Sequence, residues 1–115
     1  MRLGHRIETR PSERRVRVEC QGQVLAESIR AIELDETFLP TRYYLPREDV
    51  RGDLLEPSDT TSHCPFKGDA TYYSAAGAVD AFWVYENPSE EDAKPIAGYL
   101  APWPGRVEVV VEVES

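Results

Sequence analysis

Histidine, cysteine and lysine lie close together in the segment TTSHCPFKGDATYYS, residues 60–74. A cysteine thiolate is a strong nucleophile, and neighbouring cations favour the thiolate form. In a tight turn at Pro65, Lys67 could fold back over the sulfur of Cys64, and His63 could act as its base. These three residues are therefore the candidate catalytic group of a cysteine-dependent enzyme or redox protein.

The same segment also has a purely structural interpretation. Free cysteine is among the most buried residue types, and adjacent residues in an extended chain point to opposite faces. Cys64 would then be a packed residue at a turn, and His63 would point away from it. The other cysteine, Cys20, falls on the same predicted strand face as Val16 and Val18, so we expect it in the core. A bridge between the two cysteines is disfavoured in a reducing cytoplasm.

Aromatic side chains are the second group that could form a site. Because side chains alternate along a strand, one tyrosine of each adjacent pair should face the core and the other should face away from it. Rings with polar tips on a concave face can line a small-molecule site; the alternative is that all of them pack in the core. The candidate ligand-binding rings are Tyr43, Tyr44, Tyr72, Tyr73, Trp83 and Tyr85. Glu36 and Lys67 are expected at the rim of such a pocket, where Lys67 would suit an anionic or carbonyl group.

Acidic residues offer a weaker signal for chemistry. Glu36 and Asp49 could act as a general acid or base if buried, or could pair with a nearby cation; pairing is the interpretation that we favour. The sequence has only two histidines and no CxxC pair, so no metal site is predicted. No cofactor is expected either, because neither GxGxxG nor GxxxxGK[ST] occurs.

The length and net charge of the chain limit the classes of protein to which it can belong. A chain of 115 residues predicts one domain, and its formal net charge of −8 argues against nucleic acid or an anionic membrane surface as a partner. No apolar run approaches the length of a transmembrane helix, and the N-terminal residues lack the apolar stretch of a signal peptide. We therefore expect a cytoplasmic location.

Short alternating runs separated by turn residues predict a mainly β fold, in which antiparallel sheets fold over each other. Residues 51–69, rich in turn formers, are expected to be a long connection. Residues 46–50 and 89–94 each suit a short helical turn. Strands are expected at residues 15–20, 24–28, 30–36, 41–45, 70–75, 79–88, 96–103 and 106–114. The run 79–88 is apolar on both faces, which predicts a central strand.

Several segments resemble the bacterial and fungal family called domain of unknown function 427, also labelled nucleotidyltransferase-like. They are AESIRAIELDET, YYLPREDVR, LLEPSDTTSHCPFKGDATYYS, AFWVYENP and IAGYLA, in the order found in that family. The resemblance covers residues 15 to about 113, so residues 1–14 are expected to be an extension before a domain at 15–115. It implies a tent-like fold of two antiparallel sheets meeting at an angle, and no established activity. No DxD pair lies on a predicted strand, so the residues themselves do not predict nucleotidyl transfer.

Three functions follow from these patterns. The favoured prediction is a module that binds a small molecule or peptide in an aromatic-lined pocket. The alternative is a cysteine-dependent enzyme or redox protein using Cys64. The third is a structural or interaction subunit, either a monomer or a homodimer formed through an exposed β face.

Overall fold

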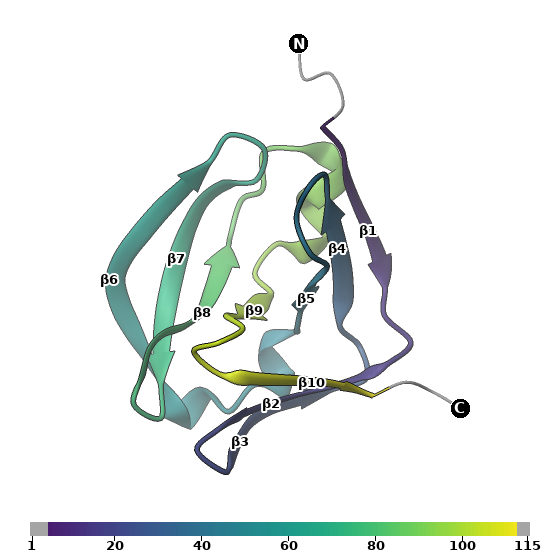
Figure 1. Ribbon diagram of the computed structural model, residues 1–115. Coiled ribbons are helices and arrows are strands. Elements are labelled where there is room, and N and C mark those ends of the chain that lie inside the picture. The colour runs from purple at the N-terminus through teal and green to yellow at the C-terminus, as the bar shows by residue number, and fades with distance from the viewer. Residues whose placement is uncertain (1–4, 113–115) are drawn as a thin grey trace.

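A computed structural model describes residues 5–112 and gives ten strands in three antiparallel sheets (Figure 1). The first sheet has the order β1–β4–β5, formed by Ile7–Pro11, Ile32–Glu36 and Arg42–Tyr44. The second has the order β10–β2–β3, formed by Glu108–Glu112, Arg15–Cys20 and Gln23–Ser28. The third has the order β6–β7–β8–β9, formed by Leu55–Cys64, Gly68–Ala75, Ala78–Tyr85 and Leu100–Pro102. The prediction of a mainly β fold is confirmed, with three sheets in place of two.

Two serine turns at one corner separate the first sheet from the second. Ser12 Oγ accepts a hydrogen bond from the backbone N–H of Arg14, and Ser28 Oγ accepts one from the N–H of Arg30. The two turns are joined, because the N–H of Ser12 donates to the carbonyl of Ala31 at 2.8 Å. The β1–β4 ladder ends at Pro11 and Ile32 on one side of these turns, and the β2–β3 ladder ends at Val16 and Ser28 on the other.

The long connection expected at residues 51–69 is instead mostly a strand, so that prediction is wrong. Leu55–Cys64 forms β6, which pairs with β7 and shifts register between Pro57 and Thr61. β6 is an edge strand whose side chains are largely exposed, so it shows no alternation of apolar residues. A proline in an edge strand costs no ladder bond when its nitrogen faces outward.

The residues expected to precede the domain contribute to the first sheet. β1 pairs with β4 from Ile7 opposite Glu36 to Pro11 opposite Ile32, and the Ile7 side chain is buried. The fold of the described chain therefore starts before residue 15; residues 1–4 of the expected extension lie outside the described residues.

Three short 3-10 segments complete the chain: η1 at Arg47–Asp49, η2 at Gly52–Leu54 and η3 at Glu91–Ile96. η1 and η3 coincide with the two predicted helical turns. Within residues 5–112, no helix is long and apolar enough to cross a membrane.

The strand β8 lies between β7 and β9, as its apolar faces predicted, and it contributes to two separate clusters of buried side chains. One cluster, called here the aliphatic core, lies between the second and third sheets and is built mainly from valine, leucine and alanine around Phe82. The other, called here the aromatic core, joins the first and third sheets around Tyr44 and Tyr85. Figure 1 shows the third sheet facing the first, with β2, β3 and β10 across the base.

Candidate functional site

A pocket of about 250 Å³ lies above the aromatic core, between the first and third sheets. The third sheet supplies Tyr72 from β7 and Trp83 and Tyr85 from β8, and the first sheet supplies Leu34, Glu36 and Arg42. The loop between β4 and β5, the turn between β6 and β7, and the segment after β9 close the sides. The lining residues are Leu34, Glu36, Leu39, Pro40, Arg42, Lys67, Tyr72, Trp83, Tyr85 and Trp103.

Two perpendicular tryptophans, Trp83 and Trp103, form the aromatic wall of the pocket. Tyr72 lies opposite Trp83 in the β7–β8 ladder, so both rings project from the same face of the sheet. The rings of Trp83 and Trp103 have centroids 6.0 Å apart and an interplanar angle of 88°, which is the favourable edge-to-face geometry. Tyr72 packs against Trp103 at 5.9 Å, and its hydroxyl is hydrogen-bonded to Ser62 Oγ at 2.8 Å. These contacts hold the rings in place and leave the pocket beside them open.

Tyr44 supports this wall from beneath. Its side chain is fully buried, and its hydroxyl accepts a hydrogen bond from Trp83 Nε1 at 3.0 Å. Burial raises the pKa of Tyr44 far above the ordinary value for tyrosine, so the phenol stays neutral. The bond sets the orientation of the Trp83 indole, so Tyr44 is a positioning residue and does not line the pocket.

A buried ion pair forms the floor. Glu36 Oε1 is 2.5 Å from Lys67 Nζ, Glu36 Oε2 is 2.9 Å from His5 Nε2, and both Glu36 and Lys67 are only 8% exposed. Burial by itself would raise the pKa of Glu36, but the hydrogen bonds from Lys67 and His5 outweigh it and lower that pKa below its usual value. His5 stacks on Phe66 at 3.6 Å, which holds the imidazole against the carboxylate.

The turn between β6 and β7 places the Lys67 side chain against Glu36 at the floor of the pocket. The backbone N–H of Lys67 donates to the carbonyl of Cys64 at 3.2 Å, which closes the turn. The next residue, Gly68, has a φ of +97° and lies so close to the chain that a Cβ would be 3.0 Å from the carbonyl oxygen of Asn87. A side chain at this position would be strained and crowded, so glycine is needed here.

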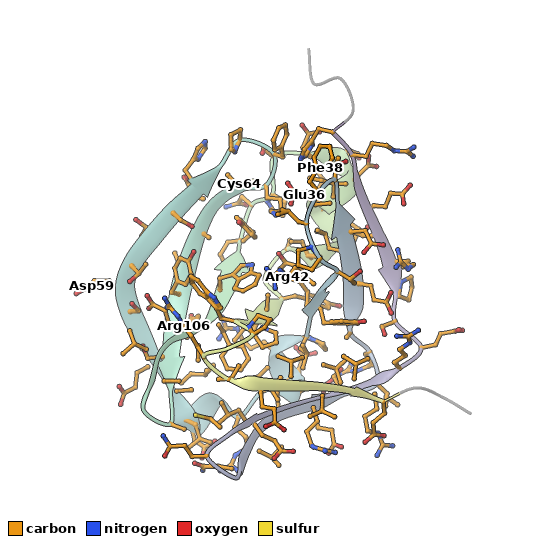
Figure 2. The ribbon with its side chains drawn as sticks, in the orientation of Figure 1. Glu36, Phe38, Arg42, Asp59, Cys64 and Arg106 are labelled. Atoms are coloured by element: carbon orange, nitrogen blue, oxygen red, sulfur yellow. The ribbon has the colours of Figure 1, made fainter. Side chains whose placement is uncertain are left out.

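Two arginines, Arg42 and Arg106, lie beside the tryptophan rings; both arginines are labelled in Figure 2. The guanidinium carbon of Arg106 is 3.7 Å from the ring centroid of Trp103, and this side chain also donates to the carbonyl of Val79 at 3.2 Å. Arg42 lies 5.7 Å from the ring centroid of Trp83. Across residues 5–112, no side-chain hydrogen bond or ion pair of Arg42 is found. Arg42 lines the pocket, so its guanidinium is beside the cavity without a carboxylate partner from the described chain.

The predicted ligand-binding residues divide between the two cores. Glu36, Lys67, Tyr72, Trp83 and Tyr85 come together in the pocket, and Tyr44 lies beneath it. Tyr43 and Tyr73 do not line the pocket but pack against the aliphatic core. The hydroxyl of Tyr73 accepts a hydrogen bond from Arg47 Nη2 at 3.2 Å.

Sequence reasoning missed five lining residues: Leu34, Leu39, Pro40, Arg42 and Trp103. For Arg42 a signal existed, since strand alternation puts it on the same face as Tyr44. For Leu39, Pro40 and Trp103 the sequence carries no comparable signal, because these residues lie in irregular segments whose direction depends on neighbouring strands.

The candidate catalytic residues lie on different faces. Cys64 is half-buried against the aromatic core, whereas His63 is exposed and its Nδ1 is 2.8 Å from Asp69 Oδ1. Lys67 is held by Glu36. The structure therefore gives the Cys64 thiol neither the His63 side chain nor the Lys67 side chain as a hydrogen-bonding partner.

The remaining predicted residues have structural contacts. Cys20 is buried in the aliphatic core, as expected, and both cysteines are free. Asp49 accepts hydrogen bonds from Ser28 and Arg30, at 2.7 Å from Ser28 Oγ and 2.9 Å from Arg30 Nη2. Burial acts to raise the pKa of Asp49, but these bonds outweigh it and lower the pKa, which confirms the interpretation of Asp49 as a paired residue. Among the described residues, no group of three or more His, Cys, Asp or Glu side chains could hold a metal ion.

Comparison with known proteins identifies a family and nothing finer. No curated protein matches the chain. The family model that matches is described as a domain of unknown function, and it extends over residues 8–113, from within β1 to the C-terminal strand. The match covers nearly the whole chain and starts before residue 15, in agreement with the pairing of β1 in the first sheet. The chain belongs to the family of the domain of unknown function DUF427.

Proposed function

We propose that the protein binds a small molecule in the aromatic pocket. The observation that carries this proposal is that both tryptophans of the chain, with Tyr72 and Tyr85, surround a volume of about 250 Å³ above a buried ion pair. Apolar walls with a few placed polar groups are typical of small-molecule sites. The volume lies below the common range of roughly 300–1,000 Å³, which favours a small ligand over a stretch of peptide.

A larger hollow elsewhere offers less to a ligand. About 660 Å³ lies between β1 and η3, but its walls carry mainly charged side chains such as Glu8, Arg10, Glu91 and Asp92. Exposed charges are well solvated and give little apolar area for a ligand to cover. The aromatic pocket is the better candidate for this reason.

The cysteine-dependent alternative has less support. Activation of a thiol needs a base or a nearby cation, and the side chains of His63 and Lys67 are bound to Asp69 and Glu36. Cys64 contacts the aromatic core and is not a lining residue of the pocket. We therefore assign Cys64 no role in ligand binding.

The test uses the indole N–H signals of Trp83 and Trp103 in NMR spectra as reporters inside the pocket. A library of small neutral, cationic and anionic compounds is added to the full chain, and we expect some compounds to shift both signals in a saturable manner. Tyr72→Ala should weaken the binding of these compounds, because the ring forms part of the pocket wall.

The matched control is Tyr73→Ala, the neighbouring residue of β7, whose ring packs against the aliphatic core. It should leave the affinity unchanged, provided that circular dichroism shows a folded protein. The proposal is wrong if no compound shifts either indole, or if Tyr72→Ala and Tyr73→Ala bind equally well.

A further inference from the structure

We infer that the ligand of the aromatic pocket is a small carboxylate with a flat apolar body, and that Arg42 binds its carboxylate group. The inference rests on the proposed function and adds the class of ligand. It depends on the net charge of the pocket, on the guanidinium of Arg42, and on the contacts that already occupy Lys67 and Arg106.

The pocket carries the opposite charge to the protein. Its lining holds two cations, Arg42 and Lys67, and one carboxylate, Glu36, which leaves one net positive charge, whereas the chain has a formal net charge of −8. Within the described residues, none of the other lining side chains can carry a charge at neutral pH. A ligand with one negative charge would neutralise the site, while a cation would meet unfavourable charge on entering.

Arg42 is the cation available to bind a ligand. Lys67 already holds Glu36 at 2.5 Å, and Arg106 is held by Val79 and stacks on Trp103. Among the described residues the Arg42 side chain has no hydrogen-bond or ion-pair partner; it lies 5.7 Å from the Trp83 ring centroid and lines the pocket. A guanidinium presents parallel N–H donors that match the two oxygens of a carboxylate.

The remaining walls suit a flat apolar body. Trp83 and Trp103 meet at 88°, and Leu34, Leu39 and Pro40 lie among the lining residues. A planar ring attached to the carboxylate could pack edge-to-face or offset against the tryptophans. Arg106 lies 3.7 Å from the Trp103 ring centroid and Arg42 lies 5.7 Å from that of Trp83, so a cationic ligand would meet a positive charge beside each ring.

The test compares four probes of similar shape: benzoate, benzamide, benzylamine and phenyl phosphate. Binding to the full chain is measured by the quenching of tryptophan fluorescence and by the two indole N–H signals. We expect benzoate to bind at least about tenfold more tightly than the neutral and cationic probes, since a charge-assisted bidentate contact is worth this much or more. Phenyl phosphate should bind less tightly than benzoate, because its second charge is not matched in the pocket.

Arg42→Gln should reduce benzoate affinity about tenfold and leave benzamide affinity nearly unchanged, and Arg42→Lys should recover only part of the loss. Arg14→Gln is the matched control, because it makes the same change of net charge at an exposed residue that does not line the pocket. It should leave both affinities as they are.

The inference is overturned if benzamide or benzylamine binds as tightly as benzoate, if phenyl phosphate binds more tightly, or if Arg42→Gln behaves as Arg14→Gln does. In each of these cases binding that depends on Tyr72 would leave the proposed function standing. If compounds of every charge leave both indole signals unmoved, the proposed function and this inference fail together.

Discussion

The aliphatic core and the aromatic core share strands of the third sheet, but the second sheet completes the first of them and the first sheet completes the other. Within the aliphatic core, Val16, Val18, Phe82 and Val84 are fully excluded from solvent. The aromatic core lies under a pocket and beside the buried Glu36–Lys67 pair. A core that serves only stability is closely packed and apolar, whereas one that supports a site leaves space and holds polar groups.

The tyrosine pairs show how the two cores are kept apart. In β5, Tyr43 packs against the aliphatic core and Tyr44 belongs to the aromatic core. In β7, Tyr73 and Tyr72 are divided in the same way. Because side chains alternate along a strand, a shift of one residue in register would exchange the two sets.

The largest expected effect is on the aliphatic core, and an exposed phenylalanine outside both cores provides the comparison. Phe82→Ala should lower the free energy of unfolding by about 4 kcal/mol, because it leaves a cavity in the aliphatic core. Phe38→Ala should change it by less than about 0.5 kcal/mol, because Phe38 is 99% exposed in the loop between β4 and β5 (Figure 2). Urea unfolding of both variants checks the contrast, and equal losses would contradict it.

The next largest effect concerns the buried ion pair. Glu36→Leu or Lys67→Met alone should each cost about 3 kcal/mol, because each removes one member of the pair and leaves the other charge buried without it. The double variant Glu36→Leu/Lys67→Met should recover much of that stability, since no buried charge remains. A double-mutant cycle by urea unfolding measures the coupling, and additive losses would show that the pair is not coupled.

A smaller effect is the dependence of stability on pH. The pKa of Glu36 is lower in the folded chain than its ordinary value of 4.5, so this group contributes stability above about pH 4.5 and loses it as the pH falls through the folded pKa. The difference in unfolding free energy between the wild type and Glu36→Gln should therefore shrink as the pH is lowered from 7 toward 3. A difference that stays constant over this range would contradict a role for the ionised carboxylate.

The smallest expected effect concerns the two thiols. Cys20 is buried in the aliphatic core, where its Sγ is 3.8 Å from the carbonyl oxygen of Ala76, whereas Cys64 is half-buried beside the aromatic core. Alkylation of the folded protein should modify Cys64 before Cys20, and Cys64→Ser should leave ligand affinity unchanged. The rates are followed by mass spectrometry in Cys20→Ser and Cys64→Ser backgrounds. Rapid alkylation of Cys64 at neutral pH that Lys67→Ala slows would revive the cysteine-dependent alternative.

The sequence by itself determined the mainly β fold, the positions of β2 and β3, the central place of β8 and the burial of Cys20. These features follow from local alternation of apolar and polar residues and from turn residues, which act over a few positions of the chain. The family resemblance was also carried by local segments. The strand β6 escaped prediction because an exposed edge strand needs no apolar pattern, only a neighbour to pair with.

Only the tertiary structure decided what each of the candidate residues does. The pairing of Lys67 with Glu36, the separation of His63 from Cys64 and the approach of Arg42 to Trp83 all depend on how the sheets face each other. Glu36 and Lys67 are 31 residues apart, so no local pattern encodes their contact. A site made by three or more strands is set by sheet packing, because alternation gives the face of a side chain but not what lies across from it.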